Sequence, residues 1–382
     1  MNINIAMCLS PFRKLINGHT FISVIAAAAC VAPAIADDVA SDQKPSISGT
    51  VNMFIADRWR YAAEDKTQRN DLFVFVEPFI KASLNKELSI QTLFTYDPAV
   101  DPHPDESRAF ANQQLHLKNL VLDYSKDTWG IYGGRFAAEF GQAWLTLPGY
   151  FGRELAEDNA IWDRNGVGGW LNVKGGETGT VRMSASAFML DTTIMSKSWI
   201  GTPTRTRKRQ FDGGPSNTGQ LDSFALSATG TKLPSVEGFS WHTGLLRQET
   251  RKISTTNSDL PEAEIGVVGG VRHEWAIDDG FVVAPMFEYQ HFWNRAGVRN
   301  AERDYISTGL EVNPGNWRLS VGYTLRINNT PNVEEKRDYL FNTSLGYEFG
   351  NGVRPEVGYR VRSIDSLEVY EITSRVLYVY KF

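Results

Sequence analysis

Strict alternation of apolar and polar residues in the last segment of the chain, residues 367–382, constrains the fold more than any other feature. Every second residue back from the end is apolar: Phe382, Tyr380, Tyr378 and Val376. The positions between them include Lys381 and Arg375. A period of two is typical of a β-strand with one apolar face. As the edge of a soluble sandwich, a strand this long and apolar would promote aggregation, whereas a strand that closes a barrel in lipid has no free edge.

Fifteen earlier segments carry a comparable signal, and each is about 10–15 residues long, the length that a tilted barrel strand requires. The sixteen predicted strands are residues 46–58, 71–84, 86–97, 112–124, 128–138, 165–175, 178–190, 219–231, 238–249, 263–276, 280–293, 303–313, 315–328, 336–349, 351–364 and 367–382. The sequence therefore predicts an all-β fold, a transmembrane antiparallel β-barrel of about 16 strands.

The connections between these segments alternate in length. Tight turns follow most of the even-numbered strands, at residues 85–86, 126–127, 175–177, 278–280, 314–315 and 350–352. Longer polar segments follow the odd-numbered strands, except the fifteenth, which is followed by a short connection; they lie at residues 58–70, 98–111, 139–164, 191–218, 250–262, 294–302 and 329–335. Short periplasmic turns and long extracellular loops are typical of a bacterial outer-membrane barrel, and an even number of strands puts both termini in the periplasm.

The two faces of the predicted strands differ as the wall of a water-filled barrel requires. In segment 351–364, one phase includes Val357 and Val361, and the other includes Glu356 and Arg360. Such polar phases are too charged for a packed core, so we expect them to line water.

Two further features of the predicted strands concern their apolar residues. Segment 71–84 is apolar in both phases, which leaves its lipid face unassigned. Trp275, Phe292 and Phe349 lie near strand ends, where aromatic residues form interfacial girdles in membrane proteins. We therefore expect these three side chains to lie at the lipid–water interfaces.

The N-terminus predicts a signal peptide, residues 1–36, that is removed to leave the barrel, residues 37–382. Arg13 and Lys14 precede an apolar run too short to span a bilayer, and an A-x-A site ends at Ala36. The n-region is long, so Met7 is an alternative start to Met1. A second alternative is a lipoprotein processing site at Cys30, but it lacks the leucine that such sites usually carry.

The composition of the predicted mature chain excludes several classes of function. It holds 37 basic and 44 acidic residues, a net charge of −7, which argues against a nucleic-acid partner. Its histidines show no metal-ligand spacing, and both cysteines lie in the signal peptide. A lipid-facing phospholipase site would need a Ser-His pair, and nothing marks a serine partner for His273. We therefore expect neither an enzyme nor a cofactor.

The last strand resembles the closing strand of Gram-negative outer-membrane barrels, which typically end in Phe after alternating aromatic residues. Tyr378, Tyr380 and Phe382 match that pattern, and the resemblance implies that they form part of the assembly signal. The segment 139–164 carries Glu139-Phe140-Gly141, a triplet often found in the third long loop of the 16-stranded trimeric general diffusion porins. The resemblance implies that this loop folds into the barrel and narrows it, and that the protein forms a homotrimer.

The candidate site is a pore constriction between an acidic loop and a basic wall. The loop residues are Glu139, Glu154, Glu157, Asp158 and Asp163. The wall residues, all in the polar phase of the last strands, are Arg318, Arg326, Arg354, Arg360, Arg362 and Arg375. Opposite charges across a pore would create a field that filters solutes by charge and polarity. A separate basic run, residues 205–209, predicts a solvated loop near lipopolysaccharide phosphates or, alternatively, an anion attractor at the pore mouth.

The sequence thus predicts a bacterial outer-membrane porin, a water-filled channel for passive diffusion of small hydrophilic solutes and ions. The expected partners are these solutes, outer-membrane lipid and lipopolysaccharide. An alternative is a substrate-selective channel for an anion or saccharide, which a line of aromatic residues or arginines along the lumen would mark. A third class is an enzyme or adhesin barrel with a filled lumen.

Overall fold

The structure of the chain is a computed structural model that describes residues 45–103, 106–176, 179–201, 205–251, 261–278 and 280–382. The predicted signal peptide, residues 1–36, lies outside the described residues. Among the helices that are described, none combines the length and the apolar character needed to cross a bilayer.

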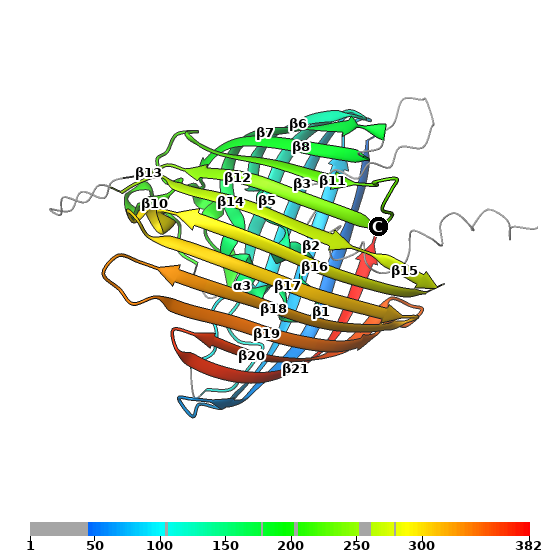
Figure 1. Ribbon diagram of the computed structural model, residues 1–382, viewed down its shortest axis with the longest axis vertical. Coiled ribbons are helices and arrows are strands. Elements are labelled where there is room, and N and C mark those ends of the chain that lie inside the picture. Colours follow the sequence, from blue (N-terminus) through cyan, green and yellow to red (C-terminus); the bar gives the residue numbers. More distant parts are fainter. Residues whose placement is uncertain (1–44, 104–105, 177–178, 202–204, 252–260, 279) are drawn as a thin grey trace, which may run out of the picture.

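Sixteen long strands form a closed antiparallel barrel (Figure 1), which confirms the predicted fold class. They are β1 (Ser46–Ala63), β2 (Arg69–Ser83), β3 (Leu88–Pro98), β5 (Gln113–Ser125), β6 (Trp129–Ala138), β7 (Ile161–Lys174), β8 (Thr180–Leu190), β11 (Ser223–Thr231), β12 (Phe239–Gln248), β14 (Glu264–His273), β16 (Phe281–Trp293), β17 (Glu302–Pro314), β18 (Trp317–Asn329), β19 (Lys336–Tyr347), β20 (Val353–Ile364) and β21 (Leu367–Lys381). The short strand β15 (Trp275–Asp278) follows β14 and pairs with the same neighbour, β16.

The seam of the barrel lies between β1 and β21. The paired positions run from Thr50 opposite Lys381 to Ala63 opposite Val369. Beyond the end of β21, Gly49 and Phe382 exchange two backbone hydrogen bonds of 2.9 and 3.1 Å. The last residue of the chain therefore takes part in closing the barrel.

Two strands extend furthest beyond their predicted bounds. β1 continues to Ala63, past the predicted end at residue 58, and β7 begins at Ile161 instead of residue 165. Both extensions pair with a neighbour, since Arg60 lies opposite Glu371 and Ile161 lies opposite Ala138. The ladder of hydrogen bonds continues there although the apolar alternation, on which the prediction rested, has ended.

Several long connections contain short elements, and some of these pair with barrel strands. These elements are β4 (Arg108–Ala109), β9 (Ile200–Gly201), β10 (Gly214–Pro215), β13 (Thr250–Arg251) and the 3-10 helices η5 (Ile194–Ser196), η6 (Gln210–Asp212) and η7 (Arg295–Gly297). β4 pairs with β2 and β9 pairs with β5, so parts of the second and fourth long loops are tied to barrel strands.

The outer surface of the barrel is apolar, as the alternation predicts. In the last strand Val376 and Tyr380 are exposed to 53% and 49%, whereas Glu371 is 1% exposed. The register also assigns the lipid face of β2, because Val74 lies opposite the exposed Ile55. Leu72, Val74 and Val76 therefore face lipid, and Phe73 and Phe75 face the lumen.

The predicted position of Phe292 at a lipid–water interface is wrong. Its side chain is 0% exposed, and its ring centre lies 5.6 Å from that of Phe140. Phe292 shares the inward phase of β16 with Glu288 and Gln290, while the next residue, Trp293, is exposed. A position near a strand end does not by itself decide the face of the barrel; the strand phase decides it.

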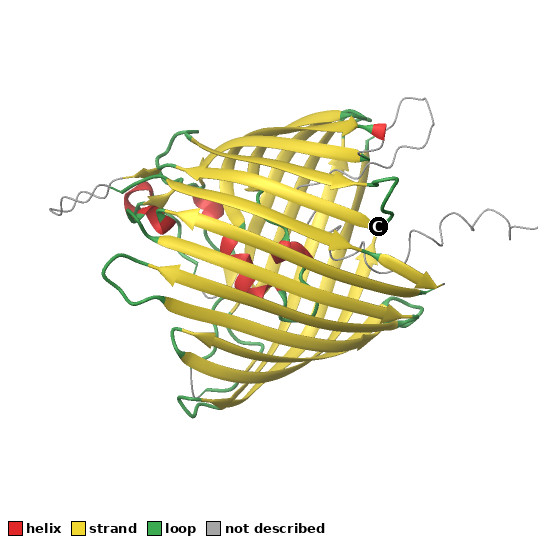
Figure 2. Cartoon of the chain, viewed as in Figure 1, coloured by secondary structure: helices red, strands yellow, loops and turns green. Residues whose placement is uncertain are grey.

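The segment between β6 and β7, called here the inner loop (residues 139–160), lies inside the barrel (Figure 2). It contains the helices α2 (Ala143–Thr146), α3 (Arg153–Ala156) and η3 (Glu157–Asn159). Its large apolar side chains, including Trp144, Leu147 and Phe151, are buried among barrel residues such as Met286 and Leu340. Burial of this apolar surface against the wall stabilises the inner loop in the lumen.

Candidate functional site: the barrel lumen

A carboxylate on β16 anchors the base of the inner loop. Glu288 accepts hydrogen bonds from the backbone N–H groups of Gln142 and Ala143 at 2.6 and 2.9 Å. It also lies 2.5 Å from the side chain of His242 on β12. The first N–H groups of a helix have no partner within the helix, so Glu288 caps the start of α2. The predicted site residue Glu139 lies at the same base, where the hydroxyl of Ser227 donates to it at 3.3 Å.

The acidic residues further along the inner loop contact the basic wall directly. Glu154 forms ion pairs with Arg360 and, at 2.8 Å, with Arg362. Asp158 accepts a hydrogen bond from Arg326 at 2.7 Å. The loop is therefore docked on β18 and β20 by charge-assisted contacts, and these carboxylates do not face the arginines across an open gap.

Asp163 lies away from these contacts, in a buried ionic cluster at the start of β7. Arg135 contacts it at 2.5 Å, and Arg205 and Lys208 contact it at 2.6 and 3.1 Å. Arg135 also forms an ion pair with Asp191. Two of the four basic residues in the run 205–209 therefore bind a buried carboxylate, so the predicted solvated loop needs correction at Arg205 and Lys208, which are only partly exposed. Their charge is drawn to Asp163, which sequence spacing does not place near them.

All six predicted wall arginines project into the lumen, and each has an acidic partner. Arg318 contacts Glu348 at 3.1 Å, and Arg375 contacts Glu356 at 2.7 Å. The remaining pairs link Arg326 with Asp338, Arg354 with Glu356, Arg360 with Glu371 and Arg362 with Glu154. The acidic partners on neighbouring strands lie in the same inward phase as the arginines, and this shared phase is the sequence signal that could have found them.

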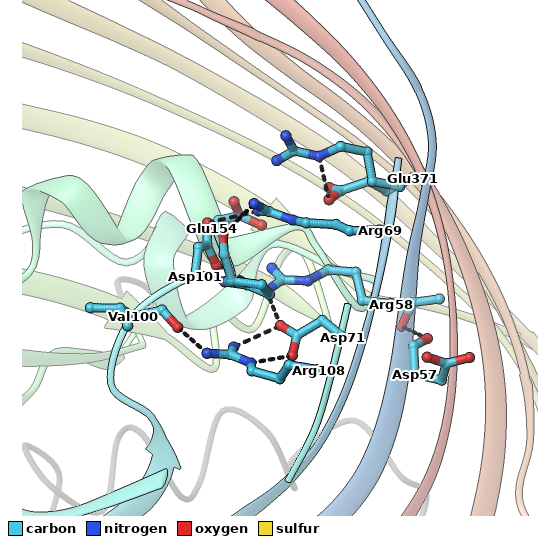
Figure 3. A network of polar contacts seen from close by, with 12 residues as sticks. Asp57, Arg58, Arg69, Asp71, Val100, Asp101, Arg108, Glu154 and Glu371 are labelled. Carbon is cyan, nitrogen blue, oxygen red and sulfur yellow. Dashed lines mark hydrogen bonds and ion pairs between the residues drawn. The ribbon is translucent and has the colours of Figure 1, made fainter. Parts of the chain in front are cut away.

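A second group of charged residues, which the sequence did not single out, lies at the lumen wall of β1 and β2 (Figure 3). Arg58 contacts Asp71 at 2.8 Å and Asp101 at 3.0 Å. Arg108 donates to both oxygens of Asp71, at 2.7 and 2.9 Å. Arg69 donates to the carbonyl of Pro102. The described part of the second long loop is thus folded back onto the wall.

Asp101 connects this group with the wall arginines of β20. Its carboxylate lies 3.8 Å from Arg69 and 4.0 Å from Arg362, in addition to its contact with Arg58. Partial burial acts to raise the pKa of Asp101, but the guanidiniums of Arg58, Arg362 and Arg69 outweigh it and hold that pKa below its ordinary value. Asp101 is therefore a carboxylate in neutral solution.

We call the combined set the upper network. Its arginines are Arg58, Arg60, Arg69, Arg108, Arg360 and Arg362, and its carboxylates are Asp71, Asp101, Glu154 and Glu371. Among the described residues, these six guanidiniums exceed the four carboxylates by a formal charge of two. The upper network is therefore a positively charged region of the lumen wall.

A cavity of about 670 Å³ lies between the inner loop and the wall formed by β1, β2, β18, β20 and β21. Its lining extends from the turn residues Gly315 and Gly352 to Arg58 and Glu154 of the upper network. Glu157, the remaining predicted loop residue, also lines it. The cavity thus extends from the barrel end that carries the short turns to the contact between the inner loop and the upper network.

Comparisons with known proteins identify the fold. No family model matches the sequence, and no curated protein matches it. Among solved structures, the outer membrane channel DcaP of Acinetobacter baumannii superposes with a TM-score of 0.55 at 11% identity, over 88% of this chain and 97% of that one.

Two further structures are similar to the same extent. A loop-deletion mutant of the Vibrio cholerae outer membrane protein OmpT has a TM-score of 0.53 at 12% identity, over 88% of this chain and 100% of that one. The anion-selective porin from Comamonas acidovorans has a TM-score of 0.53 at 10% identity, over 89% and 100% of the two chains. Identities this low show the fold alone. The chain has the 16-stranded barrel fold of bacterial outer-membrane porins.

Proposed function

We propose that the protein is an outer-membrane channel through which small hydrophilic solutes and ions diffuse passively down their gradients. The observation that carries the proposal is a charged lumen that the inner loop narrows but leaves with a cavity of about 670 Å³. Charged and polar inner faces are typical of barrels that hold water, and the apolar outer face suits a bilayer. The mechanism needs no covalent chemistry and no cofactor.

The constriction is formed where the inner loop meets the arginines of β18, β20 and β21. Glu154, Glu157 and Asp158 supply its negative charges, and the six wall arginines supply its positive charges. Glu139 and Asp163 hold the two ends of the loop, which places them in a supporting role. Charged groups that line a narrow pore filter solutes by charge and polarity.

Anion preference is a second proposal, and the upper network supports it. Its excess of two positive charges adjoins the cavity, whose lining includes Arg58 and Glu154 of the network, on the path that a solute takes past the inner loop. Lumen walls rich in one sign of charge raise the local concentration of counter-ions. The Comamonas acidovorans neighbour is described as an anion-selective porin, which agrees with this proposal for the same fold.

Planar bilayers containing the purified protein test both proposals. We expect stepwise conductance increments, and a reversal potential in a KCl gradient that shows preference for chloride. Total absence of increments from folded protein would contradict the channel proposal. Preference for potassium would leave the channel in place but reject the role given to the upper network.

We further propose that the protein assembles as a homotrimer surrounded by outer-membrane lipid and lipopolysaccharide. One neighbour, in vitro folded Vibrio cholerae OmpT, is described in a trimer form, with a TM-score of 0.50. Native mass spectrometry from lipid-like detergent should give three times the mass of the mature chain, and a monomer mass at all detergent conditions would contradict the trimer.

A further inference from the structure

A patch of aromatic side chains faces the lumen cavity. The rings of Phe54 and Phe75 are stacked at 4.7 Å with an interplanar angle of 9°, and the ring of Tyr150 lies 6.1 Å from Phe54. The guanidinium of Arg375 lies 4.8 Å from the ring centre of Tyr150 and 5.4 Å from that of Phe54. All four side chains line the cavity. A clustered apolar surface in a polar lumen is a sign of a binding function.

The strand register places an arginine at a fixed distance from this patch. Phe75 lies opposite Phe54, Phe54 opposite Leu377, and Leu377 opposite Arg354. Residues opposite one another share a face of the sheet, so this row crosses four strands on the lumen side. Adjacent strands are about 4.8 Å apart, which puts the backbone of Arg354 about 10 Å from that of Phe54. A single-ring solute with one acidic group spans such a distance.

Arg354 retains hydrogen-bonding capacity although its residue is 8% exposed. Its ion pair with Glu356 is 3.9 Å long, beyond hydrogen-bond distance, and its Nε has no hydrogen-bond partner among the described residues. Arg318 lines the same cavity, and its buried Nε is also without a hydrogen-bond partner in the described part of the chain. An arginine carries five N–H donors, and a buried donor without an acceptor is costly.

The local charge balance favours an anion at this position. Arg318, Arg354 and Arg375 meet two carboxylates there, Glu348 and Glu356. Glu356 is held by Arg375 through contacts of 2.7 and 3.1 Å, so its charge is already compensated. One positive charge remains for a solute.

We infer that this cavity binds solutes that combine a flat apolar ring with a carboxylate, that is, aromatic monocarboxylates. The ring lies on Phe54, Phe75 and Tyr150, and the carboxylate accepts hydrogen bonds from Arg354 and Arg318. This inference rests on the proposed function, since the solute reaches the cavity by entering the channel. It makes the channel selective for a chemical class of solute, beyond the general filter by charge and polarity.

The test compares three probes on the full-length mature protein in planar bilayers: benzoate, acetate and benzyl alcohol. Benzoate has both recognition elements, acetate lacks the ring, and benzyl alcohol lacks the charge. We expect benzoate to reduce the chloride current in a saturable way, with a half-saturation concentration about tenfold below that of acetate. The ring of benzoate contacts the aromatic patch and the guanidinium of Arg375, and these contacts add to the binding free energy that the carboxylate alone provides. Benzyl alcohol should have no saturable effect.

Two variants separate the two halves of the site. Phe54→Leu keeps apolar volume but removes the flat ring, and should raise the half-saturation concentration for benzoate about fivefold while leaving acetate unchanged. Arg354→Gln should raise it at least about tenfold, since hydrogen bonds to charged groups are the stronger ones. Arg303→Gln removes the same charge from a lumen position outside the cavity lining, and should leave the half-saturation concentration within about twofold of wild type.

Calorimetric titration of benzoate into the folded protein in detergent keeps this inference separate from the channel proposal. Benzoate binding should be saturable, and both Phe54→Leu and Arg354→Gln should weaken it. This result would support the site even in protein that does not conduct. Equal half-saturation by benzoate and acetate, or weakening by Arg303→Gln as large as by Arg354→Gln, would overturn the inference while conductance itself stands.

Discussion

At the scale of single residues, the lumen is a set of paired charges, and the pairing decides which substitutions are informative. Removing Arg360 would leave Glu154 and the buried Glu371 without a shared partner, so a fold defect would mask any effect on permeation. Arg362 is a better choice, because Glu154 keeps its contact with Arg360 when Arg362 is replaced.

We expect Arg362→Ser to shift the reversal potential in a KCl gradient toward potassium, because it removes one positive charge from the constriction. The shift should decrease at high salt, where the Debye length falls to about 3 Å at 1 M. Arg337→Ser removes a charge from an exposed position and serves as the control. The double variant Glu154→Gln, Glu157→Gln should shift the potential in the opposite direction. Identical potentials for all variants would place the constriction elsewhere.

The pKa of Asp101 predicts a pH-dependent contribution to stability. Since this pKa is lower in the folded state, the carboxylate stabilises the fold above the ordinary Asp pKa of about 3.9, and this contribution is lost as the pH falls through the folded-state pKa. Asp101→Asn should therefore unfold at lower urea concentration than wild type at pH 7, and the two should converge in strong acid.

The Asp101 side chain is 53% exposed, so the difference in unfolding free energy at pH 7 should stay below about 1 kcal/mol. Tryptophan fluorescence during urea titration in detergent micelles measures it. A difference that is the same at pH 7 and in strong acid would show that Asp101 acts through its shape and not its charge.

At the scale of elements, the seam between β1 and β21 depends on the last residue. Phe382 contributes two backbone hydrogen bonds to Gly49, and its ring lies 6.0 Å from that of Tyr380. We expect deletion of Phe382 to lower the amount of heat-modifiable protein in outer-membrane fractions on gels. Phe382→Tyr keeps the backbone and the ring and should assemble normally. Full assembly of the deletion variant would remove Phe382 from the assembly signal.

The inner loop is the second element whose position can be tested. Glu288→Ala removes the acceptor of two backbone N–H groups at the start of α2, which should cost about 1–3 kcal/mol of unfolding free energy. We expect noisier and larger single-channel currents, because the base of the loop is no longer held. Glu335→Ala, at an exposed position, is the control. Unchanged current noise and stability in Glu288→Ala would mean that the apolar contacts alone fix the loop.

At the scale of the whole molecule, the mature chain is expected to begin at Asp37. N-terminal sequencing of protein purified from outer membranes should read Asp-Asp-Val-Ala. Recovery of a chain that begins at an acylated Cys30 would support the lipoprotein alternative instead.

The barrel itself follows from the sequence because its signals are local. A period of two decides which residues share a face, and glycine- and asparagine-rich turns decide where a strand reverses, so all sixteen strands could be placed from the chain alone. The inward direction of the six wall arginines follows from the same phase. The end of β1 and the start of β7 do not follow from the sequence, since ladder pairing continues there without apolar alternation.

The partners inside the lumen were decided by the tertiary structure. Arg362 and Glu154 are 208 residues apart, and closure of the barrel with an inward loop is what brings them into contact. Sequence proximity to Glu154 predicts Asp163 at the constriction, but β7 carries it to Arg135, which also pairs with Asp191. Phe292 faces inward by its strand phase, and the inward fold of the loop brings Phe140 against it. Local sequence patterns determine the strands and the faces of each strand. Contacts between residues distant in sequence depend on which strands and loops become neighbours when the sheet closes.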